Sequence, residues 1–180
     1  MKRRTRRPPD PALSEKRKLG RLAYKKDKLL KALVKAKKSL EVDAEDLILL
    51  SIDPSSNSVG YAVFSLGTGE VLESGTLISK KTDPIPDRLA SLFFSVEELM
   101  EEFSPALTAI ELIHKRKTHV TLLRATGALM AALAGVPLLE VDPELWHSQA
   151  PEGYEKSDPG DAEEIAKTIY KLFNEIGGTQ

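Results

Sequence analysis

The sequence predicts an α/β fold in which a mixed five-stranded sheet is flanked by helices and preceded by a basic helical arm. Apolar runs of strand length at 47–53, 59–66 and 70–78 follow one another across short turns. Helical and strand patterns then alternate through the second half of the chain. Strands joined by tight turns run antiparallel, and strands joined through helices run parallel, so this order predicts a mixed sheet.

The second half of the chain supplies the helices and the two remaining strands. Pro86 is placed to begin a helix, and Gly135 and Gly177 are placed to end two others. The predicted elements, in chain order, are a helix at 86–103, a strand at 106–113, a helix at 118–135, a strand at 136–141 and a closing helix at 159–176.

Charge divides the chain into a basic beginning and an acidic body. Residues 1–40 contain 16 Lys and Arg against 3 Asp and Glu, whereas the rest contains 10 against 24, for a net charge of −1. We expect a disordered basic tail at 1–12, a basic amphipathic helical arm at 13–44 and a folded domain at 45–180. A basic arm on an acidic body is typical of nucleic-acid contact. The arm could equally dock a partner, pack on the body, or be a solvated tail.

Composition limits the kinds of site that the chain can build. It has no cysteine, which excludes disulfides and thiolate metal sites, and with three histidines a metal site must consist mainly of carboxylates. No apolar run approaches the roughly 18 residues of a membrane span, and no signal peptide is recognisable. We therefore expect no membrane partner and a cytoplasmic location.

Acidic residues stand at three places where the pattern makes them conspicuous. Asp53 ends the first strand, Glu111 lies between apolar residues of the fourth, and an acidic group opens the closing helix. A buried carboxylate needs a cation, a hydrogen-bond donor or a path to solvent. Carboxylates from separate elements suit Mg²⁺ or Mn²⁺. The alternatives are a turn residue for Asp53, an edge strand for Glu111, and simple complementation of the helix dipole by the acidic group.

Three segments of the body resemble one family. IDPSSNSVGYAVF (52–64) resembles the first motif of RuvC-type Holliday junction resolvases, in the RNase H-like and retroviral-integrase superfamily, and Ser55 fits its phage-like variants. The segment 86–112 resembles the following helix and the strand that carries the second acid, Glu111. The segment 127–146, which includes a Pro-x-x-Trp motif, resembles the next helix and strand.

This resemblance implies an RNase H-like nuclease domain and a Mg²⁺-dependent endonuclease that resolves four-way DNA junctions as a homodimer. It also implies two Mg²⁺ ions (Mn²⁺ being an alternative) per site, and a phage or bacterial origin. The implied catalytic and metal-binding residues are Asp53, Glu111, Asp158 and Asp161. Two alternatives stay open. One is a second register, with Asp161 and Glu164 as the last pair. The other is that the segment beginning EKSDPGDAEE is an additional helix of the bacterial family, in which case the last acidic pair is missing.

Further features leave alternatives open. A basic run could neutralise phosphates or form a solvated loop, and it comprises His114, Lys115, Arg116, Lys117, His119 and Arg124. Small residues could allow a dimer contact or tight packing on the sheet: Gly127, Ala128, Ala131 and Ala132. The alternative functions are another RNase H-like nuclease that cuts flaps or processes ribosomal RNA, and an inactive nucleic-acid-binding protein of the same fold.

Overall fold

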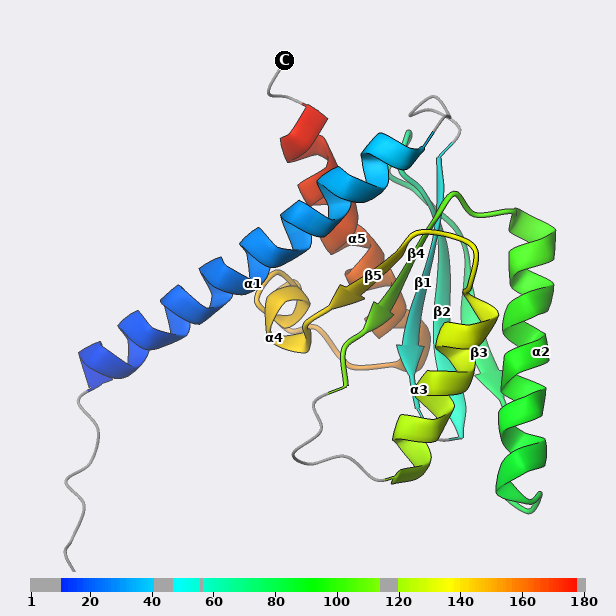
Figure 1. Ribbon diagram of the computed structural model, residues 1–180. Coiled ribbons are helices and arrows are strands. Elements are labelled where there is room, and N and C mark those ends of the chain that lie inside the picture. Colours follow the sequence, from blue (N-terminus) through cyan, green and yellow to red (C-terminus); the bar gives the residue numbers. More distant parts are fainter. Residues whose placement is uncertain (1–10, 41–46, 56, 114–119, 178–180) are drawn as a thin grey trace, which may run out of the picture.

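The computed structural model describes residues 11–40, 47–55, 57–113 and 120–177, and its centre is a single five-stranded sheet (Figure 1). The strands are β1 (Ile48–Pro54), β2 (Ser58–Ser65), β3 (Val71–Ile78), β4 (Leu107–Glu111) and β5 (Leu138–Val141). They lie in the order β3-β2-β1-β4-β5, and β1 pairs antiparallel with β2 and parallel with β4. The predicted mixed five-stranded sheet is therefore confirmed.

Helices cover both faces of the sheet and make three layers. They are α1 (Pro11–Ser39), α2 (Ile85–Phe103), α3 (Val120–Ala132), α4 (Pro143–His147) and α5 (Asp158–Gly177). Figure 1 shows α2 and α3 on one face and α1, α4 and α5 on the other. Each layer buries its own apolar cluster against the sheet.

The central strand β1 alternates between these two clusters. Leu49 is fully buried against α5 and its neighbours, and Leu50 is fully buried on the face covered by α2 and α3. Because side chains of a strand alternate, Ser51 and Asp53 share the face of Leu49. Ser51 is buried there and its Oγ donates a hydrogen bond of 2.8 Å to the carbonyl oxygen of Ala162 in α5. The side chain of Asp53 is thereby directed towards the α5 layer.

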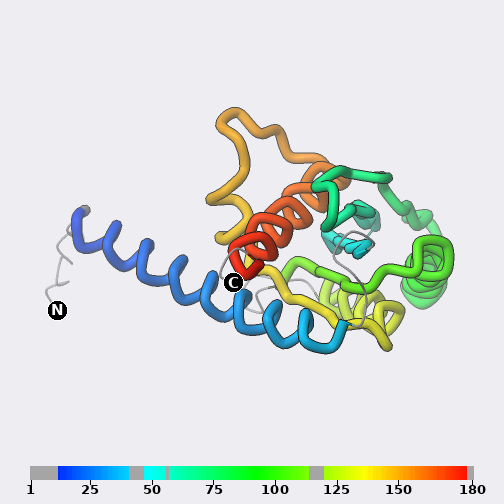
Figure 2. The backbone as a smooth tube through the Cα atoms, turned by 90° about the horizontal axis from the view of Figure 1, so that it is seen from above, coloured from blue at the N-terminus to red at the C-terminus, as the bar shows by residue number. Residues whose placement is uncertain are grey.

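Helix α1 is anchored to the body along only its second half. Leu29, Leu33 and Ala36 are buried in the cluster on the α5 face. By contrast, every residue from 12 to 21 is exposed, and Figure 2 shows this half of the helix extending away from the domain. The packing of the second half agrees with one of the roles left open for the arm, whereas residues 12–21 are all exposed.

Two details of the sequence-based prediction are corrected by the structure. Helix α1 begins at Pro11, inside the predicted disordered tail, whereas residues 1–10 and 41–46 lie outside the described part of the chain. The short helix α4 was not predicted. Its start signal is the pair Asp142–Pro143, because Asp142 caps the helix by accepting a 3.0 Å bond from the backbone N–H of Glu144, and proline suits the first helical position.

Among the residues described above, none of the helices combines the length and the apolar character that crossing a bilayer requires.

The docking of α1 can be tested with two leucines of the same helix. Leu33 has no exposed surface, so Leu33→Ala should lower the free energy of unfolding by roughly 2–4 kcal/mol through a lost contact and a cavity. Leu19 is 61% exposed, and Leu19→Ala should change the free energy of unfolding by less than about 0.5 kcal/mol. Urea denaturation measures both, and equal effects would contradict the anchored position of α1.

Candidate active site

Two predicted acids lie side by side where neighbouring parallel strands end. The register of β1 and β4 pairs Ile52 with Ile110, so Asp53 and Glu111 follow directly on adjacent strands. Strands β1, β4 and β5 are parallel, and their carboxyl ends form one edge of the sheet, called the carboxyl edge below (Figure 1). Both acids therefore stand at this edge, on the face that α5 covers.

The start of α5 reaches the same place because of a glycine in β2. Gly60 pairs with Asp53 across the antiparallel ladder. A Cβ atom on Gly60 would lie 1.7 Å from the carbonyl oxygen of Asp158, a distance that no side chain can occupy. Glycine at this position thus lets the first turn of α5 rest directly on the sheet beside Asp53.

The charges of the four predicted ligands interact. Burial, followed by the charges of Glu111, Asp161 and Asp158, raises the pKa of Asp53 to about 8, and only Lys156 opposes this. Burial also raises the pKa of Glu111, against the hydrogen bond from Trp146 and the charge of Lys156. Asp53, Glu111, Asp158 and Asp161, called the acidic cluster below, therefore concentrate negative charge that the protein balances only in part.

Two aromatic side chains hold carboxylates of the acidic cluster. The indole N–H of Trp146 donates a 2.9 Å hydrogen bond to Oε2 of Glu111. The hydroxyl of Tyr154 donates a 2.7 Å hydrogen bond to Oδ1 of Asp161. Trp146 is almost fully buried, so its indole is a fixed support. Each carboxylate keeps a second oxygen that these two bonds do not use.

Three residues at this site have roles that were not predicted from the sequence. Trp146 was noted only as part of a motif, and Tyr154 and Lys156 were not singled out. Lys156 lies 3.1 Å from Nε2 of His147, measured from its Nζ, and its charge acts on both Asp53 and Glu111. The segment between α4 and α5 has no regular pattern, so only its short length between Trp146 and Asp158 could have indicated a position near the site.

Glu164, the residue of the second register, has a different environment. It is 5% exposed, lies two turns from the start of α5, and accepts a 2.8 Å hydrogen bond from Lys167. The negative charge of Glu164 is therefore already paired. Asp158 and Asp161, by contrast, act directly on Asp53. These environments favour Asp158 with Asp161 as the pair that completes the cluster.

The acidic cluster suits divalent cations in charge and in donor type. Within the ranges that the structure describes, no three Asp, Glu or His side chains already converge on one point as a closed set of ligands. Hard cations such as Mg²⁺ take carboxylate oxygens and keep several waters, so they do not need a closed protein cage. Burial and, after it, the charges of the neighbouring acids raise the pKa of Asp53, and a bound cation would offset both effects.

Other predicted features lie partly outside the described residues. Most of the predicted basic run, residues 114–119, lies outside the described residues, and Arg124 is exposed on α3. Of the small residues on α3, Ala132 is buried against the domain's own sheet face, whereas a Cβ on Gly127 would meet no atom within 4 Å. A dimer contact at α3 stays a prediction.

A protein-family model matches the part of the chain that carries the first two acids. The model of the crossover junction endodeoxyribonuclease RuvC matches residues 49–142, slightly more than half of the chain. The chain belongs to the RuvC family. The matched segment contains Asp53 and Glu111 and ends before Asp158, so the last two acids depend on the geometry described above.

Relatives with the same description support this membership. A RuvC crossover junction endodeoxyribonuclease of Finegoldia magna is 32% identical over 135 residues, which cover 71% of this chain and 81% of the relative. One of Petrotoga mobilis is 26% identical over 133 residues, covering 70% and 81%.

Solved structures share the fold. Thermus thermophilus RuvC, in complex with a Holliday junction substrate, superposes with a TM-score of 0.60 at 20% identity over 73% of this chain and 96% of that one. The yeast mitochondrial Holliday junction resolvase Ydc2 superposes with a TM-score of 0.58 at 14% identity, over 87% and 96%. The expectation of an RNase H-like architecture of the RuvC type is therefore confirmed.

The contact at Gly60 gives a matched pair of variants. Gly60→Ala should force the start of α5 away from Asp53 and lower the free energy of unfolding by roughly 1–3 kcal/mol. Gly127→Ala, in an open position within α3, should raise it by up to about 1 kcal/mol because alanine favours the helix. Thermal unfolding of both proteins measures this, and a neutral Gly60→Ala would contradict the close approach.

The raised pKa of Asp53 predicts how stability depends on pH without divalent ions. The folded protein keeps a proton on Asp53 up to about pH 8, whereas the unfolded chain releases it near pH 4. The native environment of Asp53 therefore favours the folded state fully below about pH 4, where the carboxyl is protonated in both states. This contribution to the free energy of unfolding is lost as the pH rises to 8. Asp53→Asn should therefore melt roughly 3–8 °C above the natural protein at pH 8 in EDTA, and this gap should close towards pH 4.

The matching control is Glu98→Gln, which alters an exposed acid on α2 and should not shift the melting temperature at either pH. Adding Mg²⁺ at pH 8 should raise the melting temperature of the natural protein more than that of Asp53→Asn. A gap that is the same at pH 4 and pH 8 would refute the assigned proton.

Proposed function

We propose that this chain cuts four-way DNA junctions by metal-dependent hydrolysis of phosphodiester bonds, with the acidic cluster as its catalytic and metal-binding site. The observation that carries the proposal is the meeting of four carboxylates from β1, β4 and α5 at one edge of the sheet, in a member of the RuvC family. The proposed ligands are Asp53, Glu111, Asp158 and Asp161, and the proposed ions are two Mg²⁺, for which Mn²⁺ can substitute.

The ions and the protein have separate tasks in this proposal. Divalent ions bound here supply activation of a water molecule and stabilisation of the departing oxygen. The carboxylates supply the binding charge, and the strand ends of β1 and β4 fix the positions of Asp53 and Glu111. The rigid first turn of α5, in contact with Gly60, fixes Asp158 and leads into Asp161.

Residues around the acidic cluster orient it. Trp146 keeps one oxygen of Glu111 turned towards the core, which leaves the other for a ligand. Tyr154 does the same for Asp161. Lys156 lies close enough for its charge to act on the cluster, and it would also attract the phosphate of an approaching strand. Outer partners of this kind typically change metal affinity or activity by about 10–100-fold when removed.

The relatives named above are crossover junction endonucleases, and one of the similar structures holds a Holliday junction substrate. On this basis we propose branched DNA as the substrate of this chain as well. A four-way junction presents equivalent strands on opposite sides, so two sites are needed to cut it symmetrically. A homodimer would supply them, one from each copy.

Cleavage of labelled four-way junction DNA tests the site residue by residue. In Mg²⁺ the natural protein should nick opposite strands symmetrically, and EDTA should abolish the reaction. Asp53→Asn, Glu111→Gln, Asp158→Asn and Asp161→Asn should each lower the cleavage rate by at least about a hundredfold, which is ~3 kcal/mol of activation free energy. Glu164→Gln retains a partner for Lys167 and should stay within a fewfold of the natural rate.

Other outcomes would each point elsewhere. Loss of activity in Glu164→Gln but not in Asp158→Asn would support the second register. Faster cleavage of flaps or of RNA than of junctions would favour another RNase H-like nuclease. Junction binding without cleavage in either Mg²⁺ or Mn²⁺ would identify an inactive binding protein and overturn the proposal.

A further inference from the structure

The first half of α1 extends beyond the edge of the sheet that carries the acidic cluster. Lys25 forms 2.7 Å ion pairs with Asp142 and Glu144, which directly follow the carboxyl end of β5. At the other end of the helix, Lys37 lies over the ring of Phe173, near the end of α5. Helix α1 therefore crosses the domain from Lys37 to Lys25 and leaves it at the carboxyl edge.

The part beyond Lys25 comprises residues 12–24, called the projecting half below. Thirteen helical residues at 1.5 Å each extend roughly 20 Å. Figures 1 and 2 agree that this part of α1 points away from the domain. A duplex that leaves the acidic cluster along this side would lie next to it over about six base pairs.

Basic residues form a continuous stripe along one side of α1. They recur at spacings of three, four and seven, which place them on one face, and they are Arg17, Lys18, Arg21, Lys25 and Lys28. The side that they occupy is known, because Lys25 reaches Asp142 and the charge of Arg21 lowers the pKa of Glu144. The basic stripe therefore faces the carboxyl edge.

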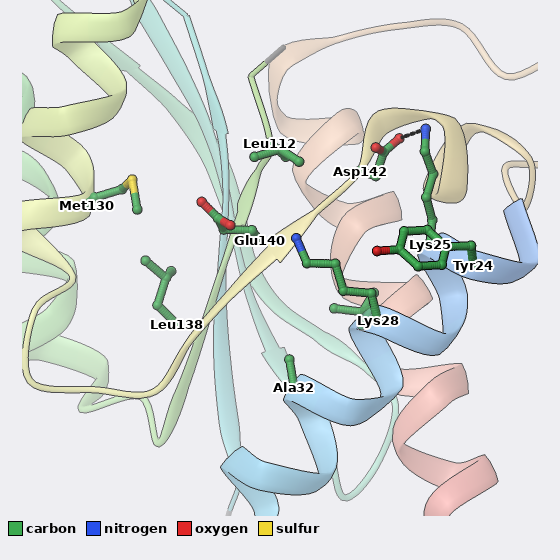
Figure 3. Close-up of a pocket in the computed structure, with 10 residues that line it drawn as sticks. Tyr24, Lys25, Lys28, Ala32, Leu112, Met130, Leu138, Glu140 and Asp142 are labelled. Carbon is green, nitrogen blue, oxygen red and sulfur yellow. Dashed lines mark hydrogen bonds and ion pairs between the residues drawn. The ribbon is translucent and has the colours of Figure 1, made fainter. Parts of the chain in front are cut away.

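The stripe continues into a groove beside β5. Figure 3 shows Tyr24, Lys25 and Lys28 of α1 along one wall, with Glu140 and Asp142 across from them. The groove has a volume of about 390 Å³, and Lys25 crosses it to form an ion pair with Asp142. Lys28 is exposed in this groove, so a cation remains available where the projecting half meets the body.

The stripe is largely unpaired. Arg17, Lys18 and Arg21 are exposed and form no ion pair within the part of the chain that the structure describes. The projecting half contains one acid, Glu15, against four basic residues. Four positive charges within about three turns of one helix repel one another, and a polyanion would relieve that repulsion.

The apolar residues of the projecting half do not provide a surface for a second copy. The large apolar side chains exposed there are Leu13, Leu19 and Tyr24. Leu13 and Leu19 are six positions apart, and Leu19 and Tyr24 are five positions apart, so neighbouring members of this set point to different faces of the helix. A helix-to-helix interface requires apolar residues that recur every three or four positions. Charge complementarity with a polyanion is the stronger feature of this surface.

We propose that the basic stripe of the projecting half binds the phosphate backbone of the duplex arm that leaves the acidic cluster. This inference deepens the proposed function and relies on it for the identity of the polyanion as DNA. The rest of the chain from residue 41 onward has 24 acidic and 10 basic residues, so it repels DNA on the whole. The stripe supplies the compensating attraction next to the site where the DNA must be held.

Salt dependence of binding tests the proposal without any cleavage. The stripe variant combines Arg17→Gln, Lys18→Gln and Arg21→Gln in the full chain, and EDTA is present throughout. A plot of log K against log salt for a labelled four-way junction should become shallower by roughly 2–3, because each lost phosphate contact removes about 0.9 from the slope. All three residues are exposed, so the melting temperature should change by no more than roughly a degree or two.

A control of equal charge separates the stripe from net charge. Lys35→Gln, Lys38→Gln and Lys171→Gln together remove three exposed cations elsewhere on the body. This variant should keep a slope within about one of the natural value. Equal losses in both variants, or an unchanged slope in the stripe variant, would overturn the proposal. An unchanged slope together with a lower sedimentation mass would show that the projecting half binds a second copy instead.

Cross-linking locates the contact. The chain has no cysteine, so Arg17→Cys and Lys35→Cys each introduce one site for a photoreactive label. The label at 17 should react with the duplex arm that lies along the projecting half, and the label at 35 should not. Reaction of both labels to the same extent would overturn the proposal. Cleavage with no such cross-link would leave the nuclease activity intact and refute the stripe alone.

Discussion

The burial of Asp53 beside three other carboxylates, at one edge of the sheet, is the constraint that the rest of the domain serves. Burial and the three neighbouring charges together raise its pKa to about 8. Such a cluster persists only if rigid elements hold each member in place. The β1–β4 ladder holds Asp53 and Glu111, and the contact between Gly60 and α5 holds the remaining two. The large apolar clusters on both faces provide the stability that this local cost requires.

Charge also explains how the chain is divided between its arm and its domain. A domain rich in Asp and Glu suits cations at its site but is a poor surface for DNA. The basic residues are concentrated in α1, which is bound to the domain through Leu33 and its neighbours and through the ion pairs of Lys25. The two opposite electrostatic requirements are thus met by separate elements that remain physically joined.

Much of this organisation could be predicted from the sequence. Periodicity indicated the strands and long helices, because each of them buries a regular apolar stripe. The segments 52–64 and 86–112 indicated Asp53 and Glu111. Helix α4 was missed because five residues are too short for a periodic pattern, although Asp142 and Pro143 mark its start. The partners Tyr154 and Lys156 depend on how an irregular segment folds back, which local patterns do not encode. The pairing of Glu164 with Lys167, which favours Asp158 over Glu164 as a ligand, likewise depends on the fold and not on a local pattern.

The short helix α4 has a mechanical consequence. Its first turn is tied to α1 through Lys25, and three residues after Pro143 the same helix presents Trp146, whose indole holds Glu111. One five-residue helix is therefore joined at its start to α1 and near its end to a carboxylate of the acidic cluster. The direction in which the arm leaves the domain and the orientation of that carboxylate are thus set by the same short turn.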